Sequence, residues 1–122
     1  MGHLKGTILV VEDEPLLLIN IADELAEAGF DVVESPNADH ALRQIAMSTA
    51  IDVLFTDVDM PGSLDGLGLS AVVRRNWPQI AIIVTSGKLS EEMVDLPLDA
   101  KFIPKPYAAS DLIHAINAAL GK

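Results

Sequence analysis

Residues 53–61 read VLFTDVDMP, an apolar run that ends at two carboxylates and a proline. The run from Val53 to Thr56 has no polar alternation, which is typical of a strand buried on both faces of a parallel sheet. Asp57 stands where this strand should end, and the loop from Met60 to Gly66 that follows is rich in proline and glycine. The stretch therefore predicts a buried strand that delivers an acid to one edge of a sheet.

The strand-then-helix pattern repeats on both sides of this stretch. Four further apolar runs predict strands at residues 7–11, 31–34, 80–85 and 101–103. Apolar residues at helical spacing predict helices after the first, second, third and fifth strands, whereas only a turn or two of helix fits between Ser90 and Leu96. Five such units in 122 residues imply an α/β fold, a doubly wound parallel sheet with helices on both faces.

The composition limits the functions that the chain can have. Half of the 122 residues are hydrophobic, so a single domain can bury a core. The 18 acidic residues outnumber the 8 basic ones, and the net charge of -10 disfavours direct binding to nucleic acid or to an anionic membrane. Because the chain has no cysteine, disulfides and thiol chemistry are excluded.

The sequence shows no targeting or anchoring segment. No apolar run approaches the roughly 18 residues of a membrane span, and the first residues have no apolar core of a secretory signal. We therefore expect a cytoplasmic protein with one domain over residues 1–122 and no effector domain. We expect residues 1–6 to be disordered or derived from a tag.

Polar side chains stand where four of the predicted strands end, at the edge of the sheet that carries the chemistry in such folds. Carboxylates that converge there repel one another unless a cation lies among them. An all-oxygen set suits Mg²⁺, or Mn²⁺, and a lysine adds a second positive charge. The residues concerned are Glu12, Asp13, Asp57, Thr85, Ser86 and Lys105.

Each of these residues also has a structural interpretation. Acids before Pro15 suit the N-terminus of a helix, Asp57 could end a strand in a turn, and the hydroxyls of Thr85 and Ser86 could be caps. Their joint placement favours a site for phosphoryl transfer. Asp57 would be the nucleophile, while a divalent cation and Lys105 would neutralise the developing charge.

Four stretches in this order resemble the response-regulator receiver domain of two-component signalling, the CheY-like fold. They read ILVVEDEP at 8–15, VLFTDVDMP at 53–61, IIVTSG at 82–87 and FIPKPY at 102–107. The resemblance covers nearly the whole chain. It implies a flavodoxin-like sheet with strand order 2-1-3-4-5 and a cis Lys105–Pro106 peptide bond.

The resemblance also implies roles for residues that match the family's motifs. Asp57 matches the phosphoacceptor, Asp13 a direct Mg²⁺ ligand, and Glu12 an acid that acts on the cation through water. Asp59 matches the position whose backbone carbonyl completes the metal site. The remaining matches are the switch hydroxyl of Thr85, the lysine Lys105 and the switch aromatic Phe102.

Three departures from the family's pattern are visible. The loop from Met60 to Gly66 is one residue longer than the usual form. Phe102 stands where tyrosine is frequent, so it has no hydroxyl to donate when it turns inward. The segment from Gly87 to Ala100 is short and contains Pro97, which predicts a stunted or irregular fourth helix and weakens family analogies about dimer geometry.

The favoured interpretation is a switch that takes a phosphoryl group from a histidine kinase or phosphotransfer protein and acts on an unknown protein target. Leu16 and Ile19 lie off the buried stripe of the first helix, and the family docks its kinase on this helix; a partly covered helix edge is the plainer explanation. Two alternatives are an adaptor that no longer cycles phosphate and a haloacid-dehalogenase-type phosphatase starting at Asp57-Val58-Asp59. The second is disfavoured because two βα units precede the motif.

Overall fold

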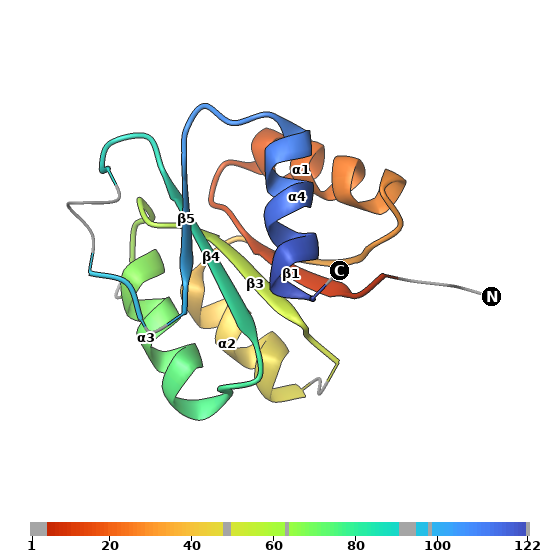
Figure 1. Cartoon of the computed structure of the whole chain (residues 1–122). Helices are drawn as coiled ribbons and strands as arrows, with labels where there is room; N and C mark the ends of the chain where they lie inside the picture. The colour runs from red at the N-terminus through yellow and green to blue at the C-terminus, as the bar shows by residue number, and fades with distance from the viewer. Residues whose placement is uncertain (1–4, 48–49, 63, 91–94, 98, 122) are drawn as a thin grey trace.

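The computed structural model describes residues 5–47, 50–62, 64–90, 95–97 and 99–121. A five-stranded sheet with the order β2-β1-β3-β4-β5 forms the centre, and every neighbouring pair is parallel (Figure 1). The predicted α/β class and strand order are confirmed. In chain order the elements are β1 Thr7–Val11, α1 Pro15–Glu27, β2 Asp31–Ser35, α2 Ala38–Met47, β3 Val53–Asp57, α3 Gly66–Asn76, β4 Ala81–Ser86, β5 Lys101–Pro104 and α4 Ala109–Ala119.

The sheet separates two hydrophobic cores because side chains alternate across each strand. One face packs against α2 and α3, and the other packs against α1 and α4 (Figure 1). All five residues of β3 are buried, as expected of a central strand covered on both faces. Burial on both faces leaves the carboxyl edge of the sheet as the place where β3 can present a polar side chain.

Helix α1 shows why the local sequence sets the position of the acids before it. Pro15 occupies the first turn, where a missing N–H is no loss. The helix ends at Glu27, and Gly29, with a φ of 100°, turns the chain so that the N–H of Phe30 donates to the carbonyl of Leu25. Glu12 and Asp13 are thus held in the short connection between β1 and a fixed helix start.

The junction between β3 and α3 brings the helix very close to Asp57. Asp65 caps α3, its carboxylate accepting the N–H of Gly68 at 2.9 Å. Gly66 is the first helical residue, and a Cβ atom at that position would overlap the backbone carbonyl of Asp57. Only glycine allows this approach without a shift of one of the two segments.

Some expectations need adjustment at the edges of the fold. Lys5 and Gly6, which the sequence grouped with a disordered or tag-derived start, are hydrogen-bonded: Lys5 N–H donates to Gly29, and Asp31 N–H donates to Gly6. Residues 1–4 lie outside the described residues, and so do residues 91–94 of the short helix expected after Ser90. No helix in the described part of the chain is long and apolar enough to cross a membrane.

Candidate functional site

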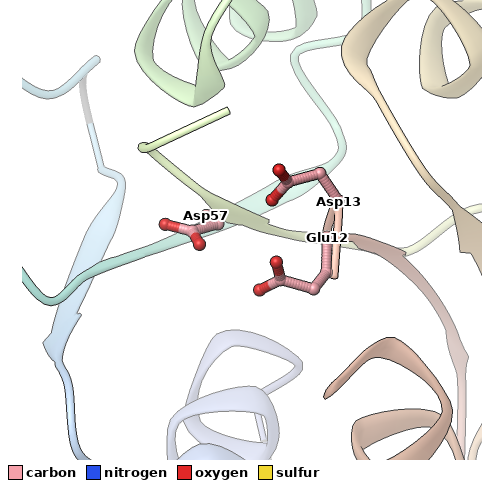
Figure 2. Close-up of side chains that lie close together, drawn as sticks. All are labelled: Glu12, Asp13 and Asp57. Carbon is pink, nitrogen blue, oxygen red and sulfur yellow. The ribbon is translucent and has the colours of Figure 1, made fainter. Parts of the chain in front are cut away.

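Three carboxylates meet at the carboxyl edge of the sheet. Glu12 and Asp13 follow β1, and Asp57 ends the neighbouring strand β3 (Figure 2). One carboxylate oxygen from each lies within 4.8 Å of the others. Glu12 and Asp57 are buried and Asp13 is exposed, so the group is open to solvent on one side. The sequence predicted this convergence, and the parallel pairing of the two strands produces it.

Asp57 has a defined partner for each of its oxygens. Lys105, which follows β5, donates from Nζ to Oδ2 at 2.8 Å, and the backbone N–H of Asp59 donates to Oδ1 at 3.1 Å. Nζ also lies 3.7 Å from Oε1 of Glu12. The Lys105–Pro106 peptide bond is cis, as the resemblance implied. A single lysine thus faces the two buried acids.

The balance of charge in this group is unfavourable to the acids. Burial raises the pKa of Glu12 to about 7, and the charge of Asp57 adds to that rise, while the N–H of Glu14 and the charge of Lys105 oppose it. Burial also acts to lower the pKa of Lys105, but the hydrogen bond and charge of Asp57 outweigh it and raise that pKa above its ordinary value. One ammonium group therefore does not neutralise the carboxylates fully.

The donor set fits a hard divalent cation. The ligand atoms available are carboxylate oxygens, which Mg²⁺ and Mn²⁺ prefer, and the open side leaves room for the waters that Mg²⁺ retains. A cation there would also oppose the rise in the pKa of Glu12 that burial and, to a lesser extent, the charge of Asp57 cause. The residues therefore suit the predicted cofactor.

The two hydroxyls that end β4 point to different partners. Thr85 pairs in register with Asp57, but its Oγ1 donates to the carbonyl of Ile103 at 2.6 Å. Ser86, which the sequence named only as a strand-end hydroxyl, donates to Oδ2 of Asp59 at 2.8 Å. Phe102 pairs with Val84 and packs half-buried on the core beneath α2 and α3. Thr85 thus directs its hydroxyl at β5 here.

The exposed apolar residues of α1 lie as predicted. Leu16 is 78% exposed and Ile19 is 48% exposed. A groove of about 740 Å³ separates other residues of α1 from the connection between β5 and α4, with Leu17, Lys105 and Tyr107 in its lining. The groove reaches the acidic group at Lys105, which contacts Asp57 and Glu12.

Comparison with known proteins decides the family. Residues 8–117 match the response regulator receiver domain. The chain belongs to that family. Among curated relatives, this receiver domain is 32% identical over 97% of its length to the sensor kinase CckA of Brucella abortus. It is also 32% identical over 93% of its length to the nitrogen assimilation regulatory protein NtrX of Azorhizobium caulinodans. It spans only 13% and 26% of these two relatives.

Solved structures agree with this assignment. A response regulator receiver protein from Sinorhizobium medicae superimposes with a TM-score of 0.88 at 29% identity, covering 95% of this receiver domain and 94% of that chain. The receiver domain of the hybrid histidine kinase CckA gives a TM-score of 0.81 at 29% identity, covering 94% and 99%. Receiver domains of similar structure thus occur both in a response regulator and in a hybrid histidine kinase.

Proposed function

We propose that this receiver domain is a phosphorylation-dependent switch in which Asp57 accepts a phosphoryl group from a phosphohistidine of a histidine kinase or phosphotransfer protein. The observation that carries the proposal is the 2.8 Å contact between Lys105 Nζ and Asp57 Oδ2. It places a cation on a buried carboxylate at the edge of the sheet, beside two further acids. Family membership supports a signalling role. In this proposal the domain is not an enzyme with a substrate of its own, because the only chemistry is its own phosphorylation and dephosphorylation.

In the proposed reaction, one carboxylate oxygen of Asp57 forms a bond to phosphorus as the bond between phosphorus and the imidazole nitrogen breaks. The nitrogen leaves with the electron pair. Lys105 neutralises charge on the phosphoryl oxygens, and its short contact to Oδ2 means that it needs little movement to do so. Burial of Asp57, which is 5% exposed, strengthens that attraction.

The residues that would hold Mg²⁺ or Mn²⁺ are Glu12, Asp13, Asp57 and the backbone carbonyl of Asp59. When bound, the cation supplies positive charge against the phosphoryl oxygens and the carboxylates. Asp13 is the exposed member of the group, while Glu12 is buried and would act through water. The N–H of Asp59 donates to Oδ1 at 3.1 Å and so orients the Asp57 carboxylate.

Phosphorylation would change which hydrogen bonds Thr85 makes. Its hydroxyl would leave the carbonyl of Ile103 for a phosphoryl oxygen, since Thr85 already pairs in register with Asp57. Phe102, half-buried on the neighbouring strand, would then repack and alter the surface around β5. A shift of a few kcal/mol between the two arrangements is enough to change partner binding.

The donor protein would dock on α1, through Leu16 and Ile19, beside the groove that leads to Lys105. Exposed apolar residues on α1 would let the donor protein bind and, in the same complex, transfer its phosphoryl group to Asp57. The output would be an unknown protein target rather than nucleic acid, because the net charge is -10. The same charge disfavours an anionic membrane. A cytoplasmic location is part of the proposal.

The proposal is tested by incubation with acetyl phosphate and separation on a phosphate-affinity gel. We expect a retarded band that needs Mg²⁺ and disappears in Asp57→Asn. A band that persists in Asp57→Asn would refute the acceptor assignment. No band under any condition would favour an adaptor that does not cycle phosphate, and enzyme-like turnover of p-nitrophenyl phosphate would favour a phosphatase.

A further inference from the structure

The hydroxyl of Ser86 joins two segments that border the acidic group. Ser86 ends β4 and is 1% exposed. Its Oγ donates to Oδ2 of Asp59 at 2.8 Å and accepts the backbone N–H groups of Lys88 at 3.1 Å and Leu89 at 3.0 Å. A serine hydroxyl has one hydrogen to donate and two lone pairs to accept, so every position is used. With two N–H groups on the oxygen, its own hydrogen is directed at Asp59.

Two hydrogen bonds hold Asp59 in place, one on its side chain and one on its backbone. The carboxylate is held by Ser86, and the backbone N–H is held by Oδ1 of Asp57. Among the described residues, the carboxylates whose oxygens lie mutually close are those of Glu12, Asp13 and Asp57. Asp59 is two residues from Asp57 in the chain, yet its carboxylate stands outside that group.

We propose that Ser86 is a positioning residue that keeps the Asp59 carboxylate out of the cation site and thereby lowers the affinity of the site for Mg²⁺. The inference rests on the proposed function, since it requires Mg²⁺ to bind beside Asp57. A fourth carboxylate near a divalent cation is attracted to it. The bond to Ser86 competes with that movement, so its loss would leave Asp59 free to approach.

The test is isothermal titration of Mg²⁺ into the full, unphosphorylated chain after treatment with EDTA. We expect Ser86→Ala to bind Mg²⁺ about threefold to tenfold more tightly than the wild type. In an Asp59→Asn background, Ser86→Ala should change nothing. Asparagine keeps the acceptor for Ser86 and the backbone carbonyl but has no charge to bring to the cation.

Ser35→Ala is the matched control. Ser35 is fully buried at the end of β2, and its hydroxyl donates to the carbonyl of Asn37 at 3.0 Å and contacts Nδ1 of His40 at 2.8 Å. Its removal deletes a comparable buried hydroxyl with no contact to Asp59. We expect Ser35→Ala and Ser86→Ala both to lower Tm in EDTA, and Ser35→Ala to leave the Mg²⁺ affinity unchanged.

The outcomes separate the inference from the proposed function. A wild-type chain that binds no Mg²⁺ would refute the metal site, and the inference with it. If the wild type binds Mg²⁺ and Ser86→Ala binds it equally or more weakly, the role of Ser86 is wrong while the site stands. The inference is also overturned if Ser86→Ala tightens binding to the same extent in the Asp59→Asn background.

Discussion

Nζ of Lys105 lies 2.8 Å from Oδ2 of Asp57 and 3.7 Å from Oε1 of Glu12, so one ammonium group faces both buried acids of the site. The lysine follows β5, at one edge of the sheet, whereas the acids come from the interior strands β1 and β3. The contact with Asp57 spans 48 positions in the sequence. It therefore depends on the whole sheet being assembled.

Replacement of Lys105 by glutamine should slow phosphorylation of Asp57. Glutamine retains hydrogen-bond donors but loses the charge that would neutralise the phosphoryl oxygens, and we expect the initial rate of labelling by acetyl phosphate with Mg²⁺ to fall by about tenfold or more. Lys101→Gln is the control, because Lys101 is an exposed lysine on the same strand. Equal rates in Lys105→Gln and the wild type would contradict the role given to this lysine.

Glu12 should make the metal-free protein less stable as the pH rises. Its pKa is about 7 in the folded chain against an ordinary value of 4.5. Between about pH 4.5 and pH 7, the folded state binds more protons at Glu12 than the unfolded state does. The free energy of unfolding therefore falls as the pH increases through this range. Urea denaturation in EDTA should show this fall in the wild type and a smaller one in Glu12→Gln.

Saturating Mg²⁺ should restore the free energy of unfolding that the metal-free protein loses at neutral pH, because the cation binds the ionised carboxylates of the folded state. Identical pH dependence in the wild type and Glu12→Gln would show that Glu12 is not the group responsible.

Gly66→Ala should damage both the fold and the site. A Cβ there would overlap the backbone carbonyl of Asp57, so either α3 or the end of β3 must move. We expect a loss of about 2 kcal/mol or more in the free energy of unfolding, measured by urea denaturation. Gly87→Ala is the control, since a Cβ at Gly87 meets only side-chain atoms of Lys105, at 3.6 and 3.7 Å. Comparable losses in both variants would contradict a special requirement at Gly66.

Leu16→Ser should separate docking from chemistry. We expect slower transfer from a cognate phosphohistidine protein and unchanged labelling by acetyl phosphate, which needs no docking surface. Met47→Ser is a matched control, because Met47 is 82% exposed but belongs to α2, which packs on the opposite face of the sheet. If Leu16→Ser leaves transfer from the protein donor at the wild-type rate, α1 is not the docking surface.

Much of the fold could be predicted because short apolar runs indicate buried strands and the polar residues after them indicate where the strands end. The apolar run before Asp57 indicated a central strand, and β3 is buried throughout. Parallel strands end at a common edge, so the meeting of Glu12, Asp13 and Asp57 followed from the order of the strands. Predicted boundaries shifted by a residue, as at β4, where the strand begins at Ala81 and ends at Ser86.

The directions of individual side chains could not be predicted in the same way. Successive residues of a strand face opposite sides, so Thr85 and Ser86 must diverge. Which of the two meets Asp59 depends on the path of the loop after β3. The hydrogen bonds from Thr85 to Ile103 and from Ser86 to Asp59 depend on side-chain rotamers and on the geometry of the loops. The periodicity of the sequence predicts neither bond.

The central claim is that Asp57 is the phosphoacceptor. Its most direct test is mass-spectrometric mapping of the phosphorylated residue after brief treatment with acetyl phosphate and Mg²⁺. We predict a single phosphoryl group on the peptide that contains Asp57, and none in Asp57→Asn. A phosphoryl group at another residue of the wild type, or one that persists in Asp57→Asn, would contradict the account.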